Sequence, residues 1–132
     1  PTRRSSDLKS WHLAPRENHL IGMAFGAGLA GKRPAVLIQN SGLGLCLDAL
    51  FGMFCLYNQG LLMIVSNRGV LEWEEIQHQD WGKCTESLLL ASKIKMIYFD
   101  EEGVEGLKRA AKIAFENNQV VALMMQRGNL DE

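Results

Sequence analysis

Short apolar runs alternate along the chain with longer segments of mixed polarity. The apolar runs cover residues 35–39, 61–67, 95–99 and 120–125, and each is typical of a strand buried on both faces. The longer segments have apolar residues at helical spacing, and they cover residues 17–31, 44–57, 81–91 and a stretch that begins near Asp100. This repeated helix–strand order predicts an α/β fold, a doubly wound parallel sheet.

The last predicted helix has a defined beginning. Asp100 is placed to cap its first turn, where Glu101 and Glu102 are favoured by the helix dipole. Its predicted buried stripe consists of Val104, Leu107, Ala111 and Ala114. In contrast, the residues between the second strand and the third helix, 68–79, are predicted to form a polar surface loop.

Glycines gather at two places in the pattern. Gly22, Gly26 and Gly28 lie inside the first predicted helix, where each costs about 1 kcal/mol relative to alanine, so we expect another group to approach that backbone closely. The segment "QNSGLG", residues 39–44, follows the first strand, and "SNRG", residues 66–69, ends the second. Ligands of open α/β sheets bind beyond the carboxyl ends of strands. These two segments, which we call the strand exits, are therefore candidate sites.

Spacing alone leaves the chemistry of these segments open. Gly42 and Gly44 can present backbone N–H groups to a ligand, or they can simply form a tight turn. Glu17 can contact a ligand, or it can be a first-turn glutamate stabilised by the helix dipole.

Composition excludes several classes of function. The chain has 132 residues, enough for one domain, and 47% of them are hydrophobic. Its 14 Lys and Arg residues are balanced by 15 Asp and Glu, so it lacks the basic field that nucleic acid requires. The longest apolar stretch, residues 43–57, is shorter than the roughly 20 residues that cross a bilayer.

The cysteines and histidines point away from disulfides and metals. Cys46, Cys55 and Cys84 show no C-x-x-C spacing, and we expect reduced core thiols and a cytoplasmic location. The three histidines, His12, His19 and His78, show no metal-ligand spacing, so no metal site is predicted.

Three blocks in order resemble the pyrimidine-binding domain of thiamine-diphosphate-dependent decarboxylases, in particular the sulfopyruvate and phosphonopyruvate group. They are Glu17 followed nine positions later by Gly26, the "QNSGLG" of residues 39–44, and the Arg68-Gly69 pair. The resemblance extends over nearly all of the chain from about Pro15. Leu45 departs from the family pattern, which has asparagine there, and this departure bears on the substrate more than on the cofactor.

The resemblance implies a catalytic role for Glu17. In that family the glutamate hydrogen-bonds the pyrimidine N1′ of thiamine diphosphate, and a carboxylate in a dry interface does so strongly and favours the imino form of the ring. The cofactor then reacts with a 2-oxo acid. The resemblance also places Asn40, Ser41, Gly42 and Gly44 around the cofactor, as a wall of the active-site cleft.

The second strand exit is implied to face the substrate. Asn67, Arg68 and His78 are the candidate substrate-binding residues, with Arg68 placed to pair with an acidic head group. An ion pair within the protein explains Arg68 equally well, and both explanations stay open.

The resemblance also implies a partner. The Gly-Asp-Gly and following asparagine pair that hold diphosphate and Mg²⁺ in these enzymes are absent from the sequence, so a β subunit or second domain would supply them in a hetero-oligomer. The implied function is that of an α subunit that converts 3-sulfopyruvate to sulfoacetaldehyde and CO2. The alternatives are phosphonopyruvate decarboxylation, another thiamine-diphosphate carboligase, and a non-catalytic flavodoxin-like pairing subunit.

Two boundaries complete the sequence predictions. Residues 1–8, "PTRRSSDL", are interpreted as a non-native segment derived from a sequencing adapter. Residues 9–132 are then the pyrimidine-binding domain, without its first strand and helix.

Overall fold

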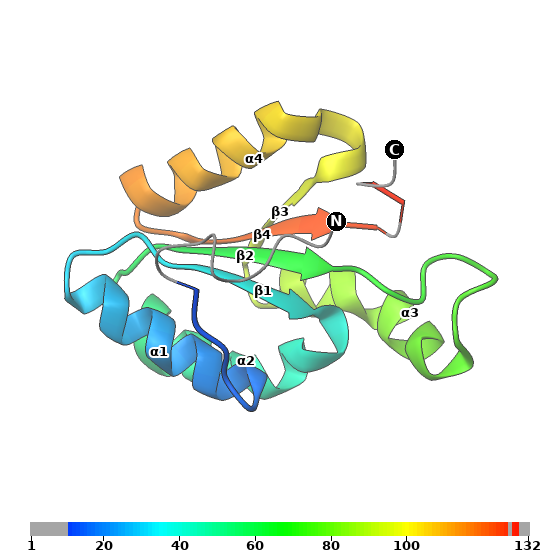
Figure 1. Cartoon of the computed structure of the whole chain (residues 1–132), viewed down its shortest axis with the longest axis horizontal. Coiled ribbons are helices and arrows are strands. Elements are labelled where there is room, and N and C mark those ends of the chain that lie inside the picture. The colour runs from blue at the N-terminus through cyan, green and yellow to red at the C-terminus, as the bar shows by residue number, and fades with distance from the viewer. Residues whose placement is uncertain (1–10, 127, 130–132) are drawn as a thin grey trace.

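A computed structural model describes residues 11–126, 128 and 129, and it shows parallel strands with helices on both sides (Figure 1). The predicted non-native segment at residues 1–8 lies outside the described residues. The helices are α1 Glu17–Leu29, α2 Leu43–Ala49, α3 Ile76–Ala91 and α4 Phe99–Glu116. The strands are β1 Ala35–Gln39, β2 Leu61–Ser66, β3 Lys95–Tyr98 and β4 Val120–Met125.

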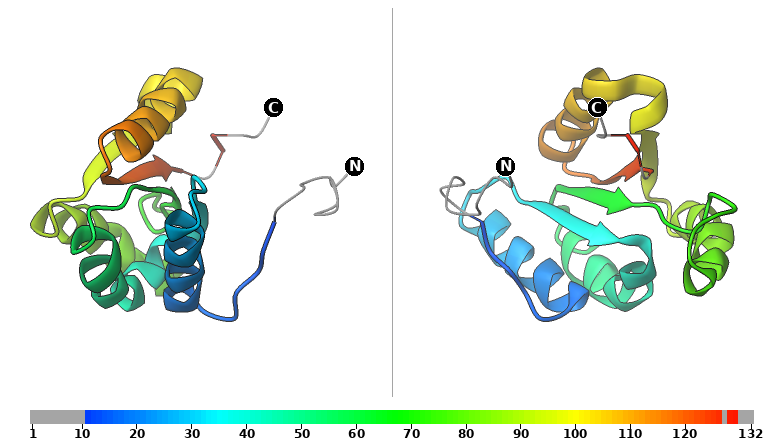
Figure 2. Two further views of the ribbon diagram at one scale, coloured as in Figure 1. Left: turned by 90° about the vertical axis from the view of Figure 1, so that its left-hand side faces the viewer. Right: turned by 45° about the vertical axis from the view of Figure 1, so that its right-hand side comes forward.

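The strands of the described residues form one parallel sheet in the order β1-β2-β4-β3, which confirms the predicted α/β fold. The chain moves across the sheet from β1 through β2 to β3, and then turns back to β4. Because parallel crossovers are right-handed, this reversal requires the last helix to cross on the opposite face. Accordingly, α1, α2 and α3 cover one face and α4 covers the other (Figures 1 and 2).

The core has one part on each face of the sheet. Between the sheet and α1, α2 and α3, the fully buried side chains include Ile21, Leu43 and Phe54. On the other face, Ala110 and Ala114 of α4 pack close to the strands. The central strands β2 and β4 are buried on both faces, as predicted for a parallel sheet.

The first strand differs from its prediction. Only one face of β1 is buried, and Leu37 on the other face is 51% exposed. The reason is that β1 is an edge strand and α4 packs on β2, β3 and β4.

The helix that follows β1 also differs from its prediction. Residues 44–57 were expected to form one helix, but the chain makes a 3-10 turn, η2 Asn40–Gly42, then α2, and then a π-helix, η3 Leu50–Cys55. Helix α3 begins at Ile76, inside the predicted loop, so the loop is shorter and the helix longer than predicted.

Helix α4 also differs from its prediction. It begins at Phe99, so Asp100 lies in its first turn rather than at its cap, together with Glu101 and Glu102. Gly103 then interrupts the helix with φ 55° and ψ −138°. The predicted stripe is partly correct, because Ala114 is buried and Leu107 and Ala111 pack against the core, whereas Val104, next to the kink, is 59% exposed. Gly106 and Ala110 complete the buried face.

The prediction of three core thiols is correct only for Cys46. Cys55 and Cys84 are exposed, and all three cysteines are free. Among the described residues, we find no helix with the length and apolarity needed to cross a bilayer.

Candidate functional site

The candidate site lies at the carboxyl ends of β1 and β2. These strands are parallel neighbours, with Gln39 in register with Ser66, so the segments that follow them emerge side by side. The sequence-predicted residues of both exits are thereby brought together at the carboxyl ends of the strands. Helix α1 adds Glu17 to this group, and α3 adds His78.

Glu17 lies directly against the first strand exit. A Cβ atom at Gly42 would lie 2.3 Å from the Cγ atom of Glu17 and 2.9 Å from its Oε1, so only glycine leaves room for this side chain. Glu17 is partly buried, and within the described part of the chain no hydrogen bond or ion pair engages its carboxylate. A half-buried carboxylate held in this way is available to a ligand.

Cys46 lies near the same carboxylate. Burial, together with the negative charge of Glu17, raises the pKa of the Cys46 thiol to about 11. The thiol therefore stays protonated at neutral pH and behaves as a small apolar group below Glu17.

Asn40 joins the two strand exits. Its side chain is fully buried, and Nδ2 lies 3.2 Å from Asn67 Oδ1, 2.9 Å from the Arg68 carbonyl and 3.0 Å from Thr85 Oγ1. The Arg68 N–H donates back to Asn40 Oδ1 at 3.3 Å. The structure therefore gives Asn40 a positioning role within the chain, and direct contact with a cofactor stays a prediction.

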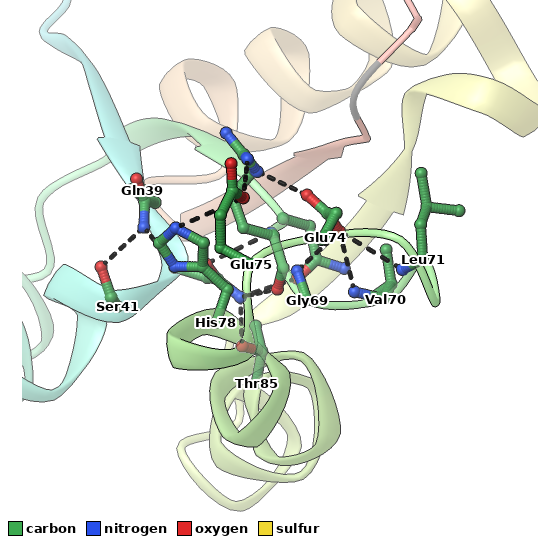
Figure 3. Close-up of polar contacts among 12 residues, drawn as sticks. Gln39, Ser41, Gly69, Val70, Leu71, Glu74, Glu75, His78 and Thr85 are labelled. Carbon is green, nitrogen blue, oxygen red and sulfur yellow. Dashed lines mark hydrogen bonds and ion pairs between the residues drawn. The ribbon is translucent and has the colours of Figure 1, made fainter.

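Gln39 makes a second connection between the exits, to the beginning of α3 (Figure 3). Its Nε2 donates to Ser41 Oγ at 3.0 Å and lies 3.1 Å from Nδ1 of His78. Because an amide nitrogen can only donate, His78 Nδ1 accepts in this arrangement and Nε2 carries the ring hydrogen. Gln39 thus fixes both the orientation and the tautomer of His78.

Arg68 is held by two carboxylates that the sequence had placed in a surface loop. Its Nε donates to Glu74 Oε1 at 2.5 Å, and its Nη2 donates to Glu75 Oε2 at 2.8 Å. The structure therefore contains the ion pair that was one of the two open explanations for this arginine. Its contact with a substrate stays a prediction.

Glu74 organises the loop after β2. Its buried Oε2 accepts backbone N–H groups from Gly69 at 2.7 Å, Val70 at 3.1 Å and Leu71 at 3.3 Å (Figure 3). Burial alone would raise the pKa of Glu74, but the hydrogen bonds from Arg68, Leu71 and Gly69 outweigh it and lower the pKa below its ordinary value. The signal missed in the sequence was an arginine-glycine pair followed within seven residues by three glutamates, two of which bind the arginine.

Glycines let the segments at this edge pack closely. A Cβ atom at Gly69, where φ is 81°, would lie 1.9 Å from the His78 carbonyl oxygen, and one at Gly82 would lie 2.0 Å from the Gly69 carbonyl oxygen. A Cβ atom at Gly44 would lie 3.0 Å from the Trp81 ring. The loop after β2 therefore rests directly on the α3 backbone.

Two further observations bear on where a metal or ligand could bind. The described residues contain no group of three or more His, Cys, Asp and Glu side chains suited to hold a metal ion. A cavity of about 270 Å³ opens at the amino ends of the strands, between Cys55, Lys93 and Gln119, away from the strand exits. Ligands of such sheets bind at the carboxyl ends, so we assign the site to the strand exits.

The known proteins to which this chain is similar share one name. No family model matches the chain. It is 33% identical over 115 residues to the sulfopyruvate decarboxylase subunit alpha of Methanococcus maripaludis, a match covering 83% of this chain and 67% of that protein. It is 34% identical over 113 residues to the corresponding subunit of Methanothermobacter thermautotrophicus, with 83% and 68% covered. The chain therefore belongs to the sulfopyruvate decarboxylase subunit alpha family.

Proposed function

We propose that the chain is the pyrimidine-binding α subunit of a thiamine-diphosphate-dependent decarboxylase that acts on 3-sulfopyruvate. The observation that carries this proposal is the Glu17 carboxylate, which rests on Gly42 without a hydrogen bond or ion pair among the described residues. The family's subunits are named for sulfopyruvate decarboxylase, which supports the reaction.

The residues present fit the cofactor. Gly42 has no side chain and so leaves room for the Glu17 carboxylate beside the turn, and the neutral thiol of Cys46 adds no competing charge. In this proposal Glu17 accepts a hydrogen bond from the pyrimidine ring, while Ser41, Gly42 and Gly44 flank the ring. Thiamine diphosphate supplies, when bound, the electron sink for the electron pair left as CO2 departs.

The substrate half of the site lies at the second exit. Arg68 and His78 are the groups that would recognise the acidic head group of a three-carbon 2-oxo acid. Asn67 is 1% exposed and its Oδ1 accepts from Asn40, so in this proposal it positions the exit.

A partner completes the site in this proposal. The name "subunit alpha" of the relatives implies a second subunit, and the proposed partner holds the diphosphate and Mg²⁺. Helix α1 supports such an interface, since nothing in the described chain comes within 4 Å of a Cβ at Gly22 or Gly26, and Met23 is 45% exposed. Three free cysteines agree with a reducing, cytoplasmic compartment.

The test is reconstitution with the partner subunit. The assembled complex is expected to release CO2 and an aldehyde from 3-sulfopyruvate, and calorimetry is expected to show negligible binding of thiamine diphosphate to this chain alone. A ligated hydroxy ketone formed from pyruvate would instead indicate a carboligase, and faster turnover of phosphonopyruvate would indicate that substrate. A complex inactive on all three substrates would leave the chain a non-catalytic pairing subunit.

A further inference from the structure

Arg68 binds two carboxylates that differ sharply in their surroundings. The Glu74 side chain is 0% exposed, and it is also held by the three backbone N–H groups of the loop. The Glu75 side chain is 56% exposed. Glu74 is therefore a permanent partner of the guanidinium, whereas the carboxylate of Glu75 is accessible to solvent anions that compete for the same guanidinium.

Glu75 also faces His78. Its Oε2 lies 2.8 Å from Arg68 Nη2 and 4.0 Å from His78 Nε2, between the two side chains. Gln39 holds the other ring nitrogen of His78, so the Nε2 hydrogen faces Glu75. The same carboxylate oxygen thus occupies a position where one guanidinium and one imidazole can bind a single anion together.

We propose that Glu75 is an internal, exchangeable occupant of an anion position formed by Arg68 and His78, and that the acidic head group of the substrate displaces it. This inference rests on the proposed function and adds the residue that competes with the substrate. Glu74 stays in place during the exchange and keeps the guanidinium oriented. The departing Glu75 side chain moves into solvent, to which it is already largely exposed.

Charge balance makes the exchange selective for anions that carry one negative charge. Replacing one carboxylate by one sulfonate leaves the charge around Arg68 unchanged. A phosphonate, which takes a second negative charge near neutral pH, adds repulsion next to the buried Glu74 carboxylate. The position is therefore matched to a singly charged oxyanion.

The test compares Glu75→Gln with Glu72→Gln in the complex of the full chain and its partner. Glu72 is an exposed carboxylate of the same loop and serves as the control. Removing the competing charge is expected to lower the KM for 3-sulfopyruvate and the inhibition constant of methanesulfonate roughly 2- to 5-fold, while Glu72→Gln changes neither. Raised or unchanged constants in Glu75→Gln would overturn the inference, because Glu75 would then only position Arg68.

A second variant guards against a local folding defect. Glu75 is the N-cap residue of α3, and Glu75→Ser removes the carboxylate while it supplies a favourable capping hydroxyl. It is expected to shift both constants in the same direction as Glu75→Gln. A shift in the opposite direction would contradict a competing role for the carboxylate.

A binding measurement separates this inference from the proposed function. Methanesulfonate and methylphosphonate are titrated into the full chain while the His78 ring signals are followed by NMR. If the complex fails to decarboxylate 3-sulfopyruvate but Glu75→Gln still binds methanesulfonate more tightly than the wild type, the proposed function is wrong and the anion position stands. If the complex is active but the variant binds no more tightly, only the inference fails.

Discussion

The side chain of Glu17 occupies the space where a Cβ atom of Gly42 would be, with its Cγ only 2.3 Å from that position. A helix that precedes β1 and a turn that follows it therefore meet at one carboxylate. The glycine has ordinary right-handed backbone angles, φ −80° and ψ −13°, so the need for glycine here is one of space rather than of conformation.

Glu17→Gln is expected to abolish turnover in the reconstituted complex, with a loss of about 10²–10⁴-fold in kcat. The amide keeps the size of the side chain but cannot provide a negative charge to the ring, so assembly is expected to persist. Steady-state decarboxylation and analytical ultracentrifugation measure the two properties. Glu101→Gln, an exposed change in α4, is the control, and unchanged decarboxylation by Glu17→Gln would remove Glu17 from the mechanism.

Gly42→Ala is expected to lower kcat at least about 10-fold while the fold persists. The new methyl group must displace the Glu17 side chain, and misplacing a catalytic group by about 1 Å is costly. Activity assays and thermal unfolding of the same preparation distinguish the two effects. Full activity would show that the position of Glu17 on this glycine is not needed.

Gly26→Ala is expected to have opposite effects on the chain and on the complex. Within the described chain nothing lies within 4 Å of the added Cβ, so the isolated chain gains about 0.5–1 kcal/mol of helix stability. If the partner approaches α1 closely, the same methyl group weakens assembly. Urea unfolding and a titration of the partner subunit measure both, and unchanged partner affinity would place the interface elsewhere.

Gly69→Ala and Gly82→Ala are each expected to destabilise the fold by more than about 1–3 kcal/mol. Each added Cβ would overlap a backbone carbonyl oxygen, at 1.9 Å and 2.0 Å respectively, so the two backbone segments would have to separate. Denaturant unfolding measures the loss. Gly52→Ala, with open space around its Cβ, is the matched control, and wild-type stability in either variant would contradict the packing of the loop on α3.

Glu74→Gln is expected to lower the free energy of unfolding by about 1–3 kcal/mol at pH 7, and this difference is expected to disappear in acid. The pKa of Glu74 in the fold is lower than in the unfolded chain, so its stabilisation is complete above the ordinary glutamate pKa and is lost as the pH falls through the lowered value. Unfolding free energies of wild type and variant should therefore converge below about pH 4. A constant difference from pH 7 to pH 3 would show that the charge of Glu74 is not what stabilises the loop.

Periodicity predicted most of the fold because most of it depends on local pattern. The bounds of β1 and β4 are those expected, and the first helix ends two residues before the predicted end. The differences arise where tertiary context decides. The exposed face of β1 follows from its place at the sheet edge, and Val104 is exposed beside the kink at Gly103.

The sequence indicated candidate residues but not the hydrogen bonds that connect them. Glu17, Arg68 and His78 were singled out, and the structure brings them to one edge of the sheet. Glu74 was missed because glutamates in a polar run ordinarily face solvent, and only tertiary structure shows that an arginine and three amides surround one of them. The bond between Gln39 and His78 spans 39 residues and leaves no local signal.

The buried amide of Asn40 has a consequence for attempts to change what this protein accepts. Because it ties the turn beside Glu17 to the segment that carries Arg68, a mutation that moves one wall of the site also moves the other. Directed evolution of a new substrate range would therefore succeed sooner at solvent-facing positions such as Glu75 than at the amide that couples the two walls.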